Sequence, residues 1–396
     1  MNILHIMASV SDEGGGPIEA LVQADAVGRR KGHRRTIVSL DLPADPWVPR
    51  CPVETIALGS PFVRRGRRTM PWLRYGFTPH LVPWLKRNLG AYDRVVVNGL
   101  WNYTALAARR VLPYRSTPYF VFPHGMLDPW FRSAYPVKHS CKQAAWWIAE
   151  GPLLQGARAV LFTSEGERTA AAGAFWPYRL RGLVTGYGTG DVPVATAGQA
   201  AAFQACVPAL GDKPYLLFLG RLHPKKGCDL LLAAFATLRR LAPDHHLVIA
   251  GPDRDGWQAA LQAMSRDLGI ADRIHWPGML RDGAKWGALF GCEAFVLPSH
   301  GENFGIAVAE ALACGKPVLL SHKVNIASEI VTAGAGLAAS DTAEGVAQLL
   351  AAYLALPVEQ RRLMADRARR CFVDRYAADR VAERTLAILE NPDQFT

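Results

Sequence analysis

The chain has 396 residues, enough for two domains of ordinary size, and half of them are hydrophobic, enough for a substantial core. No apolar run approaches the ~20 residues of a membrane-spanning helix, and seven scattered cysteines without C-x-x-C spacing favour reduced thiols over a disulfide framework. Residues 1–195 contain 24 Lys or Arg and 13 Asp or Glu, whereas residues 196–396 contain 21 of each. This basic first half predicts a polyanionic partner: nucleic acid, an anionic membrane surface or a pyrophosphate-bearing substrate.

The chain begins with a pattern typical of a Rossmann-type βαβ unit. A strand is predicted over Ile3–Ala8, a glycine-rich turn over Gly14–Gly16, a helix over Ile18–Arg30 and a second strand over Thr36–Leu40. The first ten residues lack a basic leader, so we expect a strand there and not a signal peptide. The glycine spacing is not G-x-G-x-x-G, which gives little support to a dinucleotide site.

Residues 62–87 combine cations with large aromatic side chains. The candidates for an acceptor or membrane contact in this segment are Arg64, Arg65, Arg67, Arg68 and Trp72. Such a mixture suits an anionic membrane surface or a lipid diphosphate, because cations contact head groups while amphipathic rings lie at the boundary. A solvated surface loop and a nucleic-acid contact are the alternatives. We favour the membrane or lipid-linked acceptor, and we expect no nucleic-acid partner because no recognised motif accompanies the charge.

Two further buried strands, Arg94–Asn98 and Tyr119–Pro123, are predicted in the first half, and His124 directly follows the second. Ligands of open parallel sheets collect at the carboxyl ends of strands, which favours a functional histidine over a structural one. Asp128 is a candidate acceptor contact, although an Asp before Pro is equally a turn residue. A strand over Ala159–Ser164 and a helix capped by Thr163 or Ser164 follow.

The second half repeats the alternation after a predicted linker, Pro193–Gln199. A strand over Tyr215–Leu219 leads into Gly220-Arg-Leu-His-Pro-Lys-Lys-Gly227, which places Arg221 and Lys226 in a turn before an apolar helix. Further strands are predicted over His246–Ala250, Ile274–Leu280, Ala294–Pro298 and Val318–Leu320.

The stretch Ser299–Gly315 holds the most specific pattern of the chain. Glycines permit a tight turn, a helix is predicted over Ile306–Cys314, and its N-terminus offers free N–H groups and a positive dipole that suit a phosphate. Glu302 and Glu310 bracket this helix start. Their separation, about 12 Å if fully helical, suits two ends of one extended ligand better than a single atom.

The Glu302-x7-Glu310 frame, with Gly220-Arg-Leu…Lys-Lys-Gly before it, resembles the signature of retaining GT-B glycosyltransferases of family 4 (glycosyltransferase group 1), in particular bacterial polysaccharide enzymes with a His-Gly-Met-Leu-Asp-Pro-Trp run like that at His124. The resemblance covers nearly the whole chain. It implies an α/β protein of GT-B fold, with two Rossmann-like domains facing a central cleft. We expect domains at 1–192 and 193–374, and a C-terminal helix at 375–396 that crosses back to the first domain.

The resemblance also implies roles for individual residues. Arg221 and Lys226 would neutralise the leaving diphosphate, Glu302 would contact the donor sugar and His124 would lie near the transferred sugar. The other donor-binding candidates are Gly15, Gly16, Gly220, Met279, Leu280, Asn303, Phe304, Gly305 and Glu310, the last of them for the ribose diol. No metal is expected, because two fixed cations would replace it. The loop at 184–191 lacks the asparagine usual in the family, which puts the contacts made there in doubt.

The predicted function is retaining transfer of a hexose from a nucleotide sugar to a lipid-diphosphate-linked sugar in bacterial exopolysaccharide or lipopolysaccharide synthesis. GDP-mannose is the favoured donor and a UDP-sugar the alternative, with no separate cofactor. The expected location is cytoplasmic, peripheral on the inner face of the cell membrane. A transferase with a soluble acceptor and a non-catalytic nucleotide-sugar-binding protein are the rival hypotheses.

Overall fold

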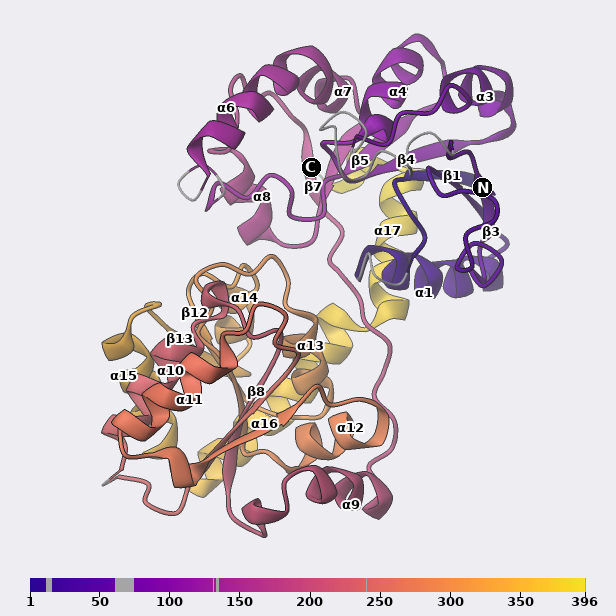
Figure 1. Ribbon diagram of the computed structural model, residues 1–396. Coiled ribbons are helices and arrows are strands. Elements are labelled where there is room, and N and C mark those ends of the chain that lie inside the picture. Colours follow the sequence, from indigo (N-terminus) through magenta and orange to yellow (C-terminus); the bar gives the residue numbers. More distant parts are fainter. Residues whose placement is uncertain (12–15, 61–74, 131, 133–134, 240, 396) are drawn as a thin grey trace. The chain divides into compact units, whose positions relative to one another are not determined.

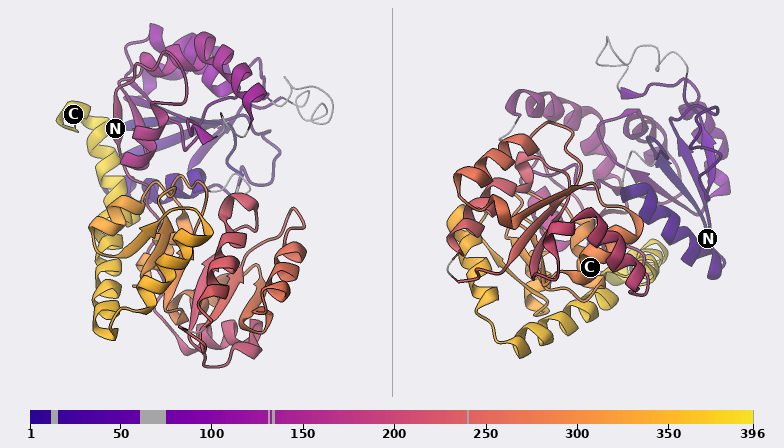
Figure 2. Two further views of the ribbon diagram at one scale, coloured as in Figure 1. Left: turned by 90° about the vertical axis from the view of Figure 1, so that its left-hand side faces the viewer. Right: turned by 60° about the horizontal axis from the view of Figure 1, so that its bottom comes forward.

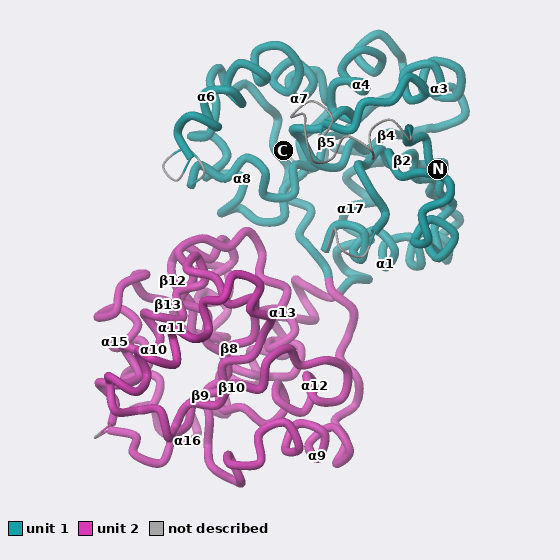
Figure 3. The backbone as a smooth tube through the Cα atoms, viewed as in Figure 1, with its two compact units in different colours: residues 1–188, 378–396 teal, residues 189–377 magenta. Residues whose placement is uncertain are grey.

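The structure is a computed structural model that describes residues 1–11, 16–60, 75–130, 132, 135–239 and 241–395. It divides into two compact units (Figure 3): the first comprises Met1–Gly188 and Ala378–Thr396, the second Thr189–Ala377. The chain therefore passes between units after residues 188 and 377, where the sequence led us to expect 192 and 374.

The first unit contains a parallel sheet whose described strands follow the order β3-β2-β1-β4-β5-β6-β7 (Figure 1). The strands are β1 (Asn2–Met7), β2 (Arg34–Ser39), β3 (Glu54–Ala57), β4 (Arg94–Asn98), β5 (Tyr119–Phe122), β6 (Ala159–Phe162) and β7 (Gly182–Val184). Strand order reverses at β1, which pairs with β2 on one side and β4 on the other. At such a switch point the loops at the carboxyl ends diverge and leave room for a ligand.

Helices cover both faces of this sheet, which is why its central strands are mostly buried and apolar. Those described are α1 (Gly16–Arg30), α3 (Leu81–Asn88), α4 (Tyr103–Val111), α6 (Pro136–Ala145), α7 (Gly151–Gln155), α8 (Glu165–Ala171) and α17 (Ala378–Glu390). The C-terminal α17 lies beside α1 (Figures 1 and 2). Surface ion pairs join the two helices, Arg30 with Asp379 at 3.0 Å and Lys31 with Glu383 at 2.8 Å.

The second unit contains a parallel sheet of order β10-β9-β8-β11-β12-β13. Its strand order reverses at β8, which pairs with β9 on one side and with β11 on the other. The strands are β8 (Tyr215–Leu219), β9 (His246–Ala250), β10 (Ile274–Gly278), β11 (Ala294–Leu297), β12 (Val318–Ser321) and β13 (Gly336–Ala339). The helices are α9 (Ala197–Cys206), α10 (Cys228–Thr237), α11 (Gln258–Asp267), α12 (Asp282–Gly291), α13 (Ile306–Ala313), α14 (Ala327–Thr332), α15 (Ala343–Leu354) and α16 (Val358–Cys371). The loops after β8 and β11, neighbours in the sheet, therefore meet at one edge.

The expectation of two Rossmann-like parallel-sheet domains is confirmed, and three strands, β4, β8 and β9, match their predicted bounds at both ends. The linker predicted over Pro193–Gln199 is wrong at its end. Helix α9 already begins at Ala197, because Thr196 and Gln199 form a capping box. Among the described residues, none of the helices is both long and apolar enough to cross a membrane.

Candidate functional site

The structure brings the candidates of the second half together at the carboxyl edge of one sheet. They lie in the loops after β8, β10 and β11 and at the start of α13. Gly16 is the first residue of α1 in the other unit. Six candidates lie outside the described residues and stay predictions: Gly15, Arg64, Arg65, Arg67, Arg68 and Trp72.

The loop after β8 is a rigid turn. His223 Nδ1 accepts a hydrogen bond from the backbone N–H of Lys225 at 3.0 Å, which caps the short helical turn Pro224–Lys226. Gly227 ends that turn with φ +70°, and a Cβ atom there would lie 2.3 Å from the carbonyl oxygen of Pro298. The loop is thus pressed against the end of β11 at a position that only glycine fits without strain.

Lys226 forms an ion pair with Glu302, and both side chains are less than one-fifth exposed. Glu310, one turn into α13, forms a second ion pair at 2.8 Å with Lys285 of α12. Each predicted ligand-binding carboxylate is therefore neutralised by a lysine from another element. In the same edge Arg221 is exposed and makes no ion pair with any described residue.

Helix α13 begins beside these pairs, and no described side chain makes a capping hydrogen bond at its N-terminus. Its N-cap is Gly305, at φ +78°, which has no side chain with which to cap the first-turn N–H groups. Glu302 precedes it and is held by the neighbouring loop, since its N–H donates to Lys323 O at 3.1 Å and its carbonyl accepts from Asn325 N–H at 3.0 Å. Such a helix start, with its first N–H groups uncapped by any described side chain and its positive dipole, suits an anion.

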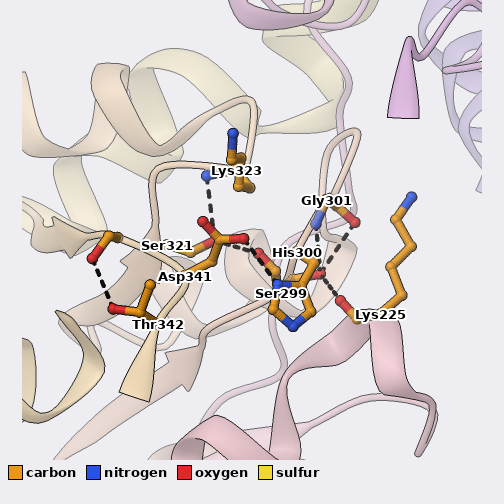
Figure 4. A network of polar contacts seen from close by, with 9 residues as sticks. Lys225, Ser299, His300, Gly301, Ser321, Lys323, Asp341 and Thr342 are labelled. Atoms are coloured by element: carbon orange, nitrogen blue, oxygen red, sulfur yellow. Dashed lines mark hydrogen bonds and ion pairs between the residues drawn. The ribbon is translucent and has the colours of Figure 1, made fainter. Parts of the chain in front are cut away.

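A polar network under the turn positions these groups (Figure 4). The hydroxyl of Ser299, which is fully buried, donates to Lys225 O at 2.8 Å, and His300 N–H donates to the same carbonyl at 2.8 Å. His300 Nδ1 lies 2.9 Å from Asp341 Oδ2. The loops after β8 and β11 are thus fastened to each other, and Lys226 and Glu302 are placed by backbone bonds on both sides.

The remaining donor candidates of this unit fall into two groups. Met279 is about half exposed, and Leu280 after it is buried. Phe304 is also buried, its ring packing edge-on against Tyr376 at 5.5 Å, so only its backbone is available to a ligand. Asn303 Oδ1 accepts a hydrogen bond from Asn325 Nδ2 at 3.3 Å. Gly220 N–H donates to Ala250 O at 2.9 Å, which fixes the start of the β8 loop.

In the first unit, His124 lies at the carboxyl end of β5 in a chain of neutral groups. Its Nε2 donates to Asn98 Oδ1 at 3.0 Å, and Asn98 Nδ2 donates to His5 Nδ1 at 3.3 Å. Burial lowers the pKa of His124 to about 3, so the ring is neutral near pH 7. His124 Nδ1 and His5 Nε2 have no hydrogen-bond partner among the described residues, and both rings line a cavity of about 70 Å³.

The backbone around His124 is strained and braced. His124 has φ +51°, uncommon for a residue with a side chain, and Gly125 follows at φ +79°. The N–H of Gly125 donates to Glu167 Oε1 at 2.7 Å. Asp128 Oδ1 accepts from Trp130 N–H at 2.9 Å, as its reading as a turn residue predicts, and its role as an acceptor contact stays a prediction.

Sequence reasoning missed two residues that shape these sites. Lys285 belongs to no motif, and only the fold reveals that α12 carries it to Glu310. Glu167 had a readable indication, because Ser164-x-x-Glu167 is a capping-box pattern. Ser164 does cap α8, but the Glu167 carboxylate accepts from Thr163 and Gly125 instead, which ties two loops together.

The second unit thus offers cations, free N–H groups and two acids to one extended anionic ligand, whereas the first offers neutral hydrogen-bonding groups. Among the described residues, no cluster of three or more His, Cys, Asp or Glu could hold a metal ion. A phosphate of the ligand would replace Glu302 as the partner of Lys226. The freed carboxylate would then accept hydrogen bonds from hydroxyl groups.

Comparison with known families gives two matches that together span most of the chain. Residues 15–186 match the family described as glycosyl transferase 4-like domain, and residues 204–371 match glycosyl transferases group 1. A curated relative, the D-inositol 3-phosphate glycosyltransferase of Frankia alni, is 34% identical over 156 residues, which are 37% of this chain and 38% of that protein. The chain therefore matches less than half the length of this relative.

Two solved structures share the fold over nearly their whole length. Sucrose-phosphate synthase from Thermosynechococcus elongatus aligns with a TM-score of 0.74 and 19% identity over 100% of both chains. Anabaena HepE in complex with UDP-glucose aligns with a TM-score of 0.72 and 18% identity, over 98% of this chain and 99% of that one. At these identities the likeness shows a common architecture of two Rossmann-like domains.

Proposed function

This chain belongs to the group 1 glycosyltransferases of family 4, which have the GT-B fold, and from that premise we propose that it transfers a hexosyl group from a nucleotide sugar with retention at the anomeric carbon. The observation that carries the proposal is the pair of lysine–glutamate ion pairs, Lys226 with Glu302 and Lys285 with Glu310, beside the uncapped start of α13. These groups match a ligand with a diphosphate between two hydroxyl-rich sugars.

The proposed donor lies with its diphosphate against Arg221, Lys226 and the first N–H groups of α13. The bond that breaks joins the anomeric carbon to a diphosphate oxygen, and negative charge grows on that oxygen as it leaves. Fixed cations and helix dipoles stabilise such charge without reorganising, which is the largest contribution in many transferases. The proposal is therefore metal-independent, and undiminished activity in excess EDTA is its expected result.

The proposed roles of the acids follow from their partners. Once the diphosphate contacts Lys226, Glu302 accepts hydrogen bonds from the donor sugar, while Glu310, held by Lys285, accepts from the ribose diol. The acceptor oxygen bonds to the anomeric carbon on the face that the diphosphate leaves, and its proton passes to the leaving phosphate oxygen. Neutral His124 accepts a hydrogen bond from a sugar hydroxyl at Nδ1, which has no described partner in this structure.

The proposed acceptor carries phosphate, because the excess of cations lies in residues 1–195. A lipid-diphosphate-linked sugar of bacterial exopolysaccharide or lipopolysaccharide synthesis is the first candidate, on the resemblance to polysaccharide enzymes. A soluble phosphorylated polyol is the second, because the Frankia relative is named for D-inositol 3-phosphate. There are likewise two candidate donors: the same resemblance favours GDP-mannose, whereas HepE was solved in complex with UDP-glucose.

The test begins with a thermal-shift screen of GDP, UDP, ADP and their sugars, since a ligand that binds only the folded state raises the melting temperature. The stabilising donor is then incubated without acceptor, and slow hydrolysis is measured. Loss of hydrolysis in Glu302→Ala and Arg221→Ala would support the transferase. A protein that binds the donor but never cleaves it, even with either phosphorylated acceptor, would instead be a non-catalytic sugar-nucleotide-binding protein.

A further inference from the structure

Helix α6 and the turn after it expose apolar side chains where a surface helix usually exposes polar ones. In α6 not one residue is buried. Spacings of four, three and four residues place Val137, Cys141, Ala144 and Ile148 on one strip, and all four are exposed. Val137 is 79% exposed and Ile148 is 73% exposed. An outward apolar strip of this kind marks a contact surface.

A groove adjoins this strip within the first unit. It has a volume of about 890 Å³ and lies between α6 with the π-helical turn Trp146–Glu150 and the residues 172–179 that follow α8. His139 and Phe175 line the groove with their ring centroids 4.7 Å apart, and the buried Trp146 stacks on Phe175 at 5.1 Å. α6 and α8 lie near each other at one end of this unit (Figure 1).

Two indoles stand at the rim of the groove and are held there by hydrogen bonds. Trp147 is 55% exposed and Trp176 is 74% exposed. Trp147 Nε1 and Gln143 Nε2 both donate to the carbonyl oxygen of Trp176, at 2.9 and 2.6 Å, and Trp176 N–H donates to Gln143 Oε1 at 3.1 Å. The exposure of Trp176 is therefore set by a clamped backbone. Indoles favour the membrane–water interface, where one side of the ring is apolar and the other polar.

The described residues that line the groove include cations and no Asp or Glu. Two further arginines of this region, Arg168 and Arg181, are already paired with Glu165 and Asp393. Arg132 and Arg179 line the groove, and Lys138 is exposed on α6. Anionic head groups complement this charge, because Lys and Arg near such a surface are attracted to it.

From this surface we propose that the first unit docks on an anionic lipid membrane through α6, the turn Trp146–Glu150 and residues 172–179. Val137, Ile148, Trp147 and Trp176 enter the interfacial layer, while Lys138 and Arg179 contact lipid phosphates. A second copy of the chain is the poorer occupant, because a twofold contact would bring the same basic patch against itself. The docking surface is independent of the donor site in the other unit, and it is distinct from the basic segment 62–87.

The experiment is vesicle flotation of the full chain, with phosphatidylcholine alone or mixed with phosphatidylglycerol. Binding only to the anionic vesicles, weakened by salt, is expected. Lys138→Glu with Arg179→Glu is expected to lower the partition coefficient at least about tenfold. Val137→Ser with Ile148→Ser is expected to lower it about tenfold as well, through lost apolar burial.

Controls separate this surface from others. Tyr114→Ser removes an equally exposed apolar side chain from the same unit, and Arg50→Glu reverses an exposed cation there; both should bind vesicles as the unchanged chain does. Donor-induced thermal stabilisation, measured on every variant, reports folding and the donor site separately from docking.

Two results would overturn the proposal. The first is that the wild-type chain does not bind anionic vesicles. The second is that the groove variants fold and still float with the vesicles, whereas neutralising Arg64, Arg65, Arg67 and Arg68 abolishes flotation. Concentration-dependent dimerisation that is lost in the serine pair, without vesicle binding, would assign the surface to a second copy.

Discussion

In the second unit, Glu302 and Glu310 are charged groups held by lysines, whereas in the first unit His124 and Asn98 are neutral groups in a buried chain. An ion pair suits an anionic ligand, because the incoming phosphate can bind the lysine. The carboxylate is then left to water or to a hydroxyl group of the ligand. A neutral histidine suits a hydroxyl group, since its Nδ1 accepts a hydrogen bond without introducing a charge. The proposed function therefore assigns phosphate binding to the second unit and hydroxyl positioning to the first.

The surfaces of the two units differ in the opposite sense. The first unit, residues 1–188 with 378–396, holds 26 Lys or Arg against 16 Asp or Glu, and the second, residues 189–377, holds 19 against 18. The first unit therefore has a neutral site within a basic surface, while the second has a charged site within a balanced one. On the proposed function, long-range attraction of anions would belong to the first unit, and short-range neutralisation of the leaving group to the second.

The largest expected effect tests the charged site. Lys226→Met should lower kcat at least about 100-fold, because it removes a cation from the developing diphosphate charge and leaves Glu302 unpaired. Donor hydrolysis and full transfer are the measurements. Lys213→Met removes an exposed lysine elsewhere in the second unit and should leave kcat unchanged. Equal activity of both variants would mean that the Lys226–Glu302 pair is structural.

The next effect tests how tightly the charged site is built. Gly227→Ala should lower the free energy of unfolding of the second unit by about 3 kcal/mol, through a left-handed backbone at φ +70° and a Cβ 2.3 Å from Pro298 O. Gly256→Ala is the matched control, since Gly256 has φ +72° with nothing within 4 Å of its Cβ position. It should lower the free energy of unfolding by only about 1 kcal/mol. If both variants lost the same free energy of unfolding in chemical denaturation, the loop after β8 would be able to shift and accommodate the added Cβ atom.

In both units the sequence predicted the longer buried elements and missed the shortest strands. In the second, local patterns placed β8, β9 and α13 with errors of no more than one residue, because buried parallel strands are continuous apolar runs and glycines mark helix ends. Strands β3, β7 and β13 were missed, since they are three or four residues long and mostly half-exposed. Three or four residues are too few for the alternation of apolar and polar side chains, or a continuous apolar run, to identify a strand.

The site residues divide by the same logic. Arg221, Lys226, Glu302 and Gly305 belong to short motifs whose spacing is local, so the sequence shows them. Lys285, at the start of α12, meets Glu310 of α13 only in the folded unit, because the two residues belong to separate helices, and no sequence spacing predicts the contact. The exposed strip of α6 was missed because an apolar pattern of helical period predicts burial, whereas here that face is exposed.

A pH experiment sharpens the comparison inside the first unit, where Glu150 is a buried carboxyl. Burial raises its pKa from 4.5 to about 7, only partly offset by the charge of Lys142, and neither carboxyl oxygen has a hydrogen-bond partner among the described residues. Between pH 4.5 and 7 the unfolded chain releases this proton and the folded chain keeps it. Stability is therefore fully present below 4.5 and is lost as pH rises through 7, by at most about 1.4 kcal/mol per pH unit.

Glu150→Gln should remove that slope, so the variant gains stability relative to the unchanged chain as pH rises from 5 to 8. Chemical denaturation at several pH values measures it. The difference between the two profiles isolates Glu150, because His124, with its pKa lowered to about 3, contributes the opposite slope below pH 6.5 in both proteins. Parallel profiles would show that Glu150 is ionised in the folded state throughout.

The smallest effect asks whether the second ion pair holds the ligand or only the helix. Lys285 contacts Glu310 at 2.8 Å and also lies 4.1 Å from the ring centroid of Trp286, so its ammonium is oriented from two sides. If it only orients Glu310 toward the ribose, Lys285→Met should weaken donor binding about fivefold, near 1 kcal/mol, and leave kcat at saturating donor unchanged. Isothermal titration with the nucleotide and steady-state kinetics separate the two quantities. A fall in kcat as large as that of Lys226→Met would place Lys285 at the diphosphate. The distinction between the Lys226–Glu302 pair, proposed to stabilise the leaving group, and the Lys285–Glu310 pair, proposed only to hold the ribose, would then be wrong.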